Sequence, residues 1–422
     1  MQSVPVKFKL SNLAVLALAL ILPIFAVAPL FYPGYIQTHS GLVPLWNVAD
    51  CPANLENLGW PNLGDLGWVP HIATHFDPLR SDGLLPYYLA GVLPFSPVAG
   101  VKVVIGLGWL LGSVGMFLWL KSWLGNPGAL IAALVYTYLP YQIATVYVRG
   151  AWGEALFWGL LPWALLIATY LVTSPQPLAF IIAAIFWLLL GLSQFGLTMW
   201  AFIFIVSLLL IVHLRQSLWP SLAALLGTAV ALILTVSLAA PPTSSVSFVD
   251  HFLYPFQLFS ARWGFGVSQP GWDDGLSLQL GLASVGLTIV TVVLWQRSDS
   301  SARRVGRTDR RLIFFLTAAI VLILLTLGLA AFLWRFPIWP GLTLANTLTY
   351  PWQLLGLAGL CLAILAGAAL WLDEQLTRLP LFAAIIIFIV LSSYTYLSPQ
   401  FIQLAQYFDA QPQAELGDAQ IA

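Results

Sequence analysis

Charged residues are scarce in this chain of 422 residues. Asp, Glu, Lys and Arg make up 8% of it, against 60% hydrophobic residues and a mean hydropathy of +0.90. A soluble domain carries about a quarter charged residues, so the composition excludes an ordinary soluble protein. It predicts an all-α polytopic membrane protein whose main partner is the lipid bilayer. The formal net charge is zero, which gives no reason to expect nucleic acid as a partner.

Two further absences limit the possible chemistry. The only cysteines are Cys51 and Cys361, which cannot define a disulfide framework or a cysteine-based metal site. The apolar stretches carry no Asp, Glu, Lys or Arg in their central portions. Ion-coupled transporters need ionisable groups near the bilayer midplane, so this absence argues against a coupled transporter. Any chemistry is therefore expected at the outer surface of the membrane.

Apolar runs of about 20 residues are long enough to cross the hydrocarbon layer. They predict about eleven membrane-spanning helices, near residues 10–32, 99–120, 127–147, 153–172, 178–193, 197–213, 219–240, 276–296, 312–333, 350–372 and 380–397. The first is expected to be an uncleaved helix, because its apolar run exceeds the roughly 7–15 residues of a signal-peptide core. The stretch 178–213 is interpreted as a hairpin of two short helices. One long tilted helix is the alternative, and it would change which loops lie outside.

The basic residues orient these helices. With the N-terminus in the cytoplasm, eleven Lys and Arg residues lie on the cytoplasmic side and five lie outside, as the positive-inside rule requires. This predicts a protein of the cell (plasma) membrane with an extracytoplasmic C-terminal tail at 398–422. The basic cytoplasmic loop 297–311 would set this orientation, or bind anionic lipid headgroups as well.

The long loops then face outward within a single integral membrane domain, 1–422. The first outer loop runs from 33 to 97, and a second runs from 241 to 275. Within the first, Leu84–Pro97 is apolar but too short to span the bilayer, and it predicts a helix lying along the outer surface.

Acidic residues are concentrated in these outer loops. The densest stretch is His71–Gly83, which contains His75, Asp77 and Asp82. Asp77 and Asp82 are candidate oxygen ligands for a divalent cation, or one of them is a candidate general base. The alternative is a solvated loop, because Asp-Pro and Ser-Asp-Gly are ordinary turn sequences. The second loop adds Arg262 among aromatic residues, which would contact a sugar or only belong to an interfacial aromatic belt.

Arg149 and Glu154 lie between two apolar runs, in "YVRGAWGEALFWGLLPWAL". They could be surface anchors, with Arg149 extended towards the headgroups and Glu154 in the first turn of the next helix. An arginine held beside a carboxylate at the outer face is also what a lipid-linked phosphate would need, because guanidinium groups bind phosphate through paired hydrogen bonds.

The region Leu85–Leu166 resembles bacterial membrane proteins of the GT-C glycosyltransferase type. It is most similar to those described as 6-pyruvoyl-tetrahydropterin synthase-related and to the YfhO-like proteins. The shared elements are Pro86–Tyr88, Pro140–Tyr141 and an "RGxxxE" element at Arg149–Glu154, and Leu348–Gly367 resembles a later "FPWR" segment.

The resemblance implies a GT-C-like fold and sugar transfer from a polyprenyl-phosphate donor at the outer face. It also implies an acidic base or metal ligand early in the first outer loop. This chain departs from that pattern: "YIQTHSGLVPLW" at Tyr35–Trp46 contains no acid, and Gln353 replaces the arginine of "FPWR".

Three functions are therefore considered. In a glycosyltransferase, Asp77 or Asp82 would be the base or metal ligand, and Arg149 with Arg262 would bind the lipid-linked phosphate. His75 and Glu154 would complete the substrate site. The second function is a non-catalytic scaffold, or a subunit associated with other membrane subunits, that retains the fold. The third is an uncoupled lipid flippase, which the charge-free helix cores disfavour.

Overall fold

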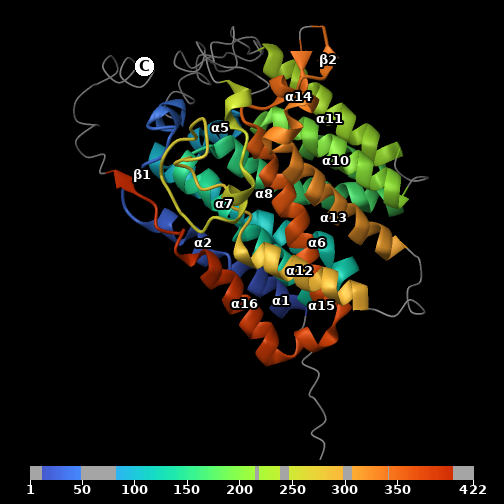
Figure 1. Ribbon diagram of the computed structural model, residues 1–422. Helices are drawn as coiled ribbons and strands as arrows, with labels where there is room; N and C mark the ends of the chain where they lie inside the picture. The colour runs from blue at the N-terminus through green and yellow to red at the C-terminus, as the bar shows by residue number, and fades with distance from the viewer. Residues whose placement is uncertain are drawn as a thin grey trace, which may run out of the picture.

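Helices make up most of the described chain. The computed structural model describes residues 12–48, 82–213, 218–237, 247–297, 307–340 and 342–402. Its longer helices are α1 (Asn12–Ile21), α6 (Pro97–Thr137), α8 (Trp152–Thr173), α9 (Pro177–Ser193), α10 (Phe195–His213), α11 (Leu218–Ser237), α12 (Leu282–Arg297), α13 (Arg307–Leu325), α15 (Leu355–Leu372) and α16 (Leu379–Tyr394). Short helices are α2 (Ile24–Val27), α5 (Leu85–Gly91), α7 (Pro140–Ala144) and α14 (Ala331–Trp334). Figure 1 shows their arrangement.

Five helical segments of the described chain are long and apolar enough to cross a membrane. They are Leu13–Phe31, Pro97–Arg149, Trp152–Thr173, Phe195–Val212 and Pro351–Leu372. Four further apolar helices have 10–17 residues: Pro177–Ser193, Leu218–Leu234, Leu282–Arg297 and Leu379–Tyr394. The protein is therefore a mostly helical membrane protein, as its composition predicts.

Two predicted pairs of helices are divided where the sequence suggested. The long helix α6 has a non-helical residue at Gly125, with φ of 69°, followed by Pro127 inside the helix. This break falls between the predicted spans 99–120 and 127–147. Helices α9 and α10 are separated by Gln194, whose φ and ψ of −161° and 100° are extended. The stretch 178–213 thus contains two helices.

Two predicted spans differ from the helices observed. Helix α12 begins only at Leu282, because residues 276–281 are not helical and the N–H of Leu280 donates to the carbonyl of Leu258. Helix α13 ends at Leu325, whose carbonyl accepts from Trp334 Nε1 at 2.9 Å. Both contacts involve residues outside the helix concerned, and the hydropathy of the sequence gives no sign of them.

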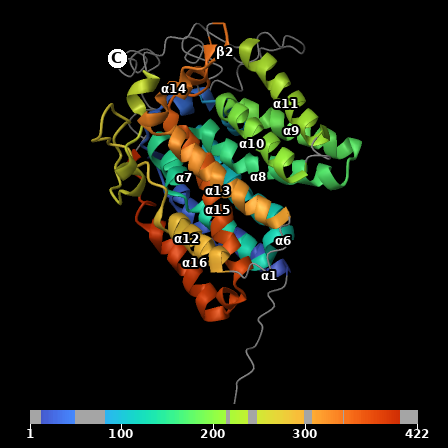
Figure 2. The same ribbon diagram turned by 45° about the vertical axis from the view of Figure 1, so that its right-hand side comes forward.

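Helix α15 forms the centre of the bundle (Figures 1 and 2). Every residue from 355 to 370 is buried, and α15 packs against α6, α12 and α13. A Cβ atom at Gly367 would lie 2.3 Å from the carbonyl oxygen of Gly128 on α6, so the two backbones are in direct contact. In a membrane the hydrophobic effect does not drive helices together, because lipid tails are as apolar as the side chains. Small residues such as glycine stabilise helix pairs there by letting the two backbones come close.

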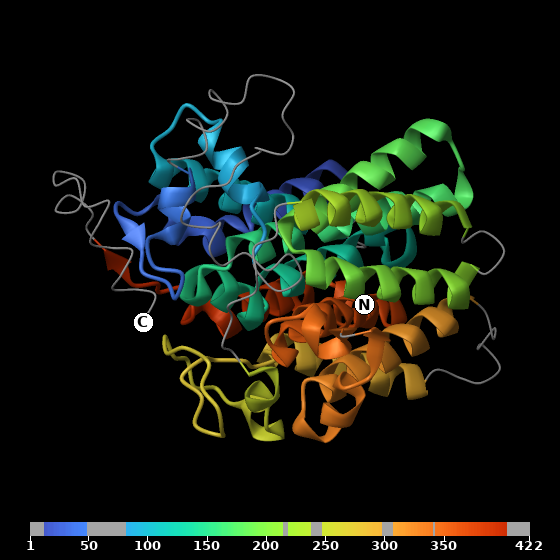
Figure 3. The same ribbon diagram turned by 90° about the horizontal axis from the view of Figure 1, so that it is seen from above.

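The described chain also contains two short antiparallel strand pairs. Strand β1 (Tyr35–Ile36) pairs with β4 (Phe401–Ile402), and β2 (Pro337–Trp339) pairs with β3 (Leu342–Thr343). Figure 3 shows residues 247–281, in yellow, at the edge of the molecule beside the orange segment that contains α14. The N–H of Leu253 donates to the carbonyl of Thr326 and joins these two segments.

Candidate functional site

A left-handed glycine brings Arg149 and Glu154 together. Residues Thr145–Arg149 form a π-helical turn, which ends at Gly150 with φ of 68°, before α8 begins at Trp152. Glycine adopts this conformation without the steric penalty of a Cβ atom. Thr38 packs tightly over the same position, because its Oγ1 would lie 2.2 Å from an added Cβ. The reversal places Arg149 Nη2 at 2.8 Å from Glu154 Oε2.

The Glu154 carboxylate is fully enclosed and fully hydrogen bonded. Its side chain is 0% exposed, and Oε2 accepts from Arg149 and from Gln353 Nε2 at 3.2 Å. Oε1 accepts from Tyr141 OH at 2.5 Å and from Trp158 Nε1 at 3.3 Å. A buried charge is tolerated only when it is paired and hydrogen bonded, and all four partners meet that requirement here.

Arg149 lies between this enclosed carboxylate and the surface of the protein. Its side chain is 10% exposed, and Nη1 donates to Tyr141 OH at 3.4 Å and to Thr145 Oγ1 at 3.3 Å. The guanidinium carbon lies 4.6 Å from the centre of the Trp352 ring. A guanidinium has five N–H donors. Among the described residues, Nε–H and one Nη2–H of Arg149 remain without a partner.

Asp82 caps the start of α8. Its Oδ2 accepts from the Gly153 N–H and its Oδ1 from the Glu154 N–H, both at 2.7 Å. Tyr87 OH also donates to Oδ2, at 3.4 Å. The residue that precedes α8, Ala151, has no side chain able to cap the helix. Asp82, from a segment distant in sequence, supplies the hydrogen-bond acceptors that an N-cap side chain usually provides. Both oxygens of this candidate base are therefore engaged.

Protonation of Asp82 is predicted to affect stability. Burial raises the pKa of its carboxyl group to about 7, although the two backbone N–H groups and Arg149 oppose this and the neighbouring Glu154 adds to it. An unfolded Asp has a pKa near 3.9, so the folded state holds a proton that the unfolded chain releases between those values. The stability from this group is fully present below about pH 4 and is lost as the pH rises through about 7.

The thermal unfolding midpoint of the wild type should therefore contain a component that falls from pH 5 to pH 8. Asp82→Asn, which cannot ionise, should lack that component. All other titrating groups are shared, so the difference between the two pH profiles isolates Asp82. Asp273→Asn is the matched control, because Asp273 is exposed. Parallel profiles for the wild type and Asp82→Asn would refute the assignment.

The loop 247–281 is joined to Trp352, whose ring lies under the Arg149 guanidinium. Ser268 Oγ accepts from Trp352 Nε1 at 3.3 Å and donates to Asp274 Oδ2 at 3.0 Å. His251 Nδ1 lies 3.0 Å from the same hydroxyl. Tyr350 stacks on Trp352 with a centroid distance of 4.6 Å. The loop and the segment before α15 thus form one polar and aromatic wall beside Arg149.

His39 connects the segment after β1 to this wall. Its Nε2 lies 3.0 Å from the carbonyl oxygen of Phe265. Its backbone N–H donates to the carbonyl of Val148, and Ser40 Oγ donates to the carbonyls of Arg149 and Gly150 at 3.1 Å each. Burial lowers the pKa of His39, with Arg149 lowering it further and Asp274 opposing the change. His39 therefore experiences the fields of both charged groups.

No protein-family model matches this sequence, and no curated protein sequence matches it either. The interpretation of the site therefore rests on its own geometry.

Of the remaining predicted site residues, the structure describes Arg262, which is not part of this cluster. Arg262 pairs with Asp273 at 2.9 Å, with side chains 70% and 72% exposed, beside a hollow of about 150 Å³ lined by Trp272 and Phe256. His75 and Asp77 lie outside the described residues. Within the described ranges, no group of three or more His, Cys, Asp or Glu side chains could hold a metal ion.

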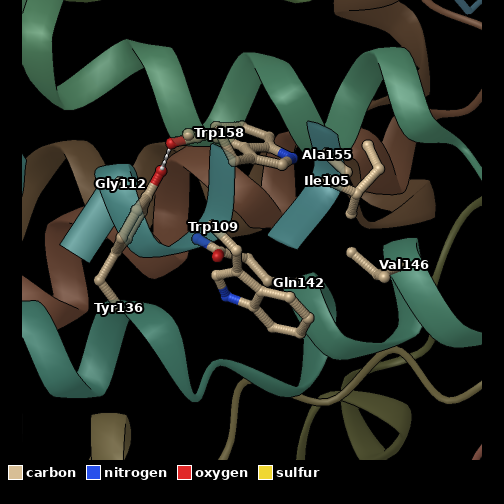
Figure 4. A pocket seen from close by; sticks show the side chains of 9 residues that line it. Ile105, Trp109, Gly112, Tyr136, Gln142, Val146, Ala155 and Trp158 are labelled. Carbon is tan, nitrogen blue, oxygen red and sulfur yellow. Dashed lines mark hydrogen bonds between the residues drawn. The ribbon is translucent and has the colours of Figure 1, made fainter. Parts of the chain in front are cut away.

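A small cavity lies between α6, α7 and α8 (Figure 4). Trp109, Gln142 and Tyr136 line it, and the Tyr136 hydroxyl donates to the carbonyl of Trp158 at 2.7 Å. Its volume of about 10 Å³ is close to the minimum that holds one water molecule. Such a space is too small for a sugar.

The sequence predicts Arg149, Glu154 and Asp82 as site residues, but it does not predict three side chains that lie next to them in the structure. Tyr141 and Trp158 bind the Glu154 carboxylate, and His39 adjoins Arg149. A signal existed for Trp158, because residues four apart share a helix face. No sequence signal links His39 to Phe265, 226 residues later.

Proposed function

We propose that this chain is a GT-C-like glycosyltransferase of the plasma membrane that transfers a sugar from a polyprenyl-phosphate donor at the extracytoplasmic face. The observation that carries the proposal is the buried Arg149–Glu154 pair in contact with Trp352 and Gln353. Two of the segments that carry the resemblance, Arg149–Glu154 and Leu348–Gly367, are thereby in direct contact.

The proposal includes eleven spans with a cytoplasmic N-terminus. In that topology, the segments around 35, 82, 150, 193, 265 and 402 are all outer. They contact one another: β1 pairs with β4, Asp82 with Gly153, Gly83 with Ser193, and His39 with Phe265. On the other side, the Arg311 guanidinium lies 5.2 Å from the Trp123 ring, and both segments would be cytoplasmic. In Figure 1, α5 and α14 lie at the opposite end from the α15–α16 connection, which supports this topology.

Arg149 would bind the lipid-linked phosphate. Its two remaining N–H groups suit two phosphate oxygens, because charge-assisted paired bonds are the preferred guanidinium–phosphate geometry. Glu154, Tyr141 and Trp352 fix the orientation of the guanidinium in advance. A group held in its binding geometry loses less conformational entropy when the ligand arrives.

One set of observations favours a second candidate, a non-catalytic membrane subunit that retains the fold. Asp82 is committed to capping α8, and Glu154 is enclosed. Gln353, in the position of the family's arginine, donates to Glu154 and brings no charge of its own. In this candidate, the Arg149 cluster would only stabilise the contact between outer segments.

Binding of undecaprenyl phosphate to the full chain in nanodiscs, measured by native mass spectrometry, separates the two candidates. A transferase should retain the lipid phosphate, and Arg149→Lys should weaken binding about tenfold or more, because losing charged hydrogen bonds costs about 1.5–3 kcal/mol. Lysine keeps the charge but not the paired geometry. Arg335→Lys, an exposed arginine of the same predicted face, is the matched control. If the wild-type protein does not retain the lipid phosphate and purifies only together with other subunits, the result would support the second candidate.

A further inference from the structure

His39 is held against Arg149 by contacts from two directions. Its own N–H and the neighbouring Ser40 hydroxyl bind the backbone of residues 148–150. From the other side, its ring contacts the carbonyl of Phe265 in the second outer loop. The imidazole therefore lies where the first outer loop, the Arg149 turn and the second outer loop meet, and these segments cover it only in part.

The contact with Phe265 determines which ring nitrogen carries the proton. A backbone carbonyl accepts hydrogen bonds and cannot donate them, so Nε2 must be the N–H donor at 3.0 Å. In the neutral ring, the lone pair is then on Nδ1. Nδ1 has no hydrogen-bond partner in the part of the chain that the structure describes. His39 thus presents an unoccupied proton acceptor beside the proposed phosphate site.

We propose that His39 is the general base of the transfer reaction, taking the proton of the acceptor hydroxyl on Nδ1. This rests on the proposed glycosyltransferase function. The acceptor oxygen forms a bond to the anomeric carbon of the donor sugar as its proton passes to Nδ1. The bond between that carbon and the phosphate oxygen breaks, and its electron pair leaves with polyprenyl phosphate, whose charge Arg149 stabilises. The imidazolium then releases its proton to water.

The charged groups around His39 fit this role. Arg149 favours the neutral ring, and Asp274 favours the imidazolium that forms during the reaction. Asp274 is itself held by Ser268 Oγ and by the Leu276 N–H at 2.9 Å. Burial also lowers the pKa of His39, so the ring is neutral and able to accept a proton at neutral pH. Asp82, whose oxygens cap α8, is not required as the base.

The test uses His39→Gln, because a glutamine amide can still donate to the Phe265 carbonyl but cannot accept a proton at neutral pH. Full-length protein in proteoliposomes is given undecaprenyl phosphate-linked glucose, galactose or mannose, with cell-envelope material as acceptor. In the wild type, the transfer rate should rise with pH through the titration of His39. His39→Gln should lose this rise and transfer about 10²–10⁴-fold more slowly, while it retains undecaprenyl phosphate as the wild type does.

Imidazole added to His39→Ala should restore part of the rate, which a purely positioning role for His39 would not allow. A rate and pH profile of His39→Gln that match those of the wild type would overturn the assignment of the base but leave the proposed function intact. A wild type that transfers none of these sugars would instead overturn the transferase function itself. The two failures are thus distinguishable.

Discussion

Glu154→Ala is expected to destabilise the folded protein by about 3–5 kcal/mol, because it leaves the largely buried Arg149 without its counter-ion. The substitution also removes the acceptor for Tyr141, Trp158 and Gln353. Buried donors without partners each carry a desolvation penalty of about 1–3 kcal/mol. The measurement is the free energy of unfolding in mixed micelles, followed by tryptophan fluorescence.

The chain contains a matched control for this prediction. Arg262–Asp273 has nearly the same N–O distance as Arg149–Glu154, 2.9 Å against 2.8 Å, but both of its side chains are exposed. Exposed ion pairs contribute about 0–1 kcal/mol, so Asp273→Ala should have little effect. The double variant Arg149→Met/Glu154→Gln should recover much of the loss, since it removes the unpaired charge and keeps an acceptor. Equal effects of Glu154→Ala and Asp273→Ala would show that burial does not determine the energetics of the pair.

The helices were largely predictable because a bilayer imposes a simple rule on the sequence. Each crossing needs an uninterrupted apolar run, and breaks such as Gly125 with Pro127 are visible in the sequence. The start of α12 and the end of α13 were not predictable from the sequence. Just before α12, the Leu280 N–H donates to the Leu258 carbonyl, and at the end of α13 the Leu325 carbonyl accepts from Trp334 Nε1. Hydropathy continues unchanged through both places.

The site was predictable only in part, for a related reason. Arg149 and Glu154 are close in sequence and are the only charges between two apolar runs, so their association could be anticipated. The cap on α8 could not, because Asp82 lies 71 residues before the Gly153 N–H that it binds. Asp82 in a turn-rich loop suggests a solvated or catalytic carboxylate equally well. Only the folded chain brings its two oxygens onto the first turn of a helix.

Gly153→Ala is expected to disrupt the same cap from the helix side. An added Cβ would lie 2.4 Å from the carbonyl oxygen of Ser193, 2.6 Å from the Gly83 nitrogen and 2.7 Å from Asp82 Oδ1. Two of these atoms belong to backbone, which cannot move aside as a flexible side chain could. Overpacking typically costs about 1–3 kcal/mol, and displacing Asp82 from the two N–H groups adds about 0.5–2 kcal/mol for a lost helix cap. The unfolding midpoint should fall sharply.

Gly286→Ala is the control, because Gly286 is also helical but an added Cβ meets nothing within 4 Å. There the higher helix propensity of alanine should stabilise the protein by up to about 1 kcal/mol, so the two glycine substitutions should have opposite signs. Gly153→Ala should also weaken retention of undecaprenyl phosphate, since shifting the first turn of α8 moves Glu154 away from Arg149. A Gly153→Ala protein as stable as Gly286→Ala would mean that segment 82–83 does not pack against α8. The proposed orientation of Arg149 would then lose its support, because the same first turn carries the carboxylate that holds the guanidinium.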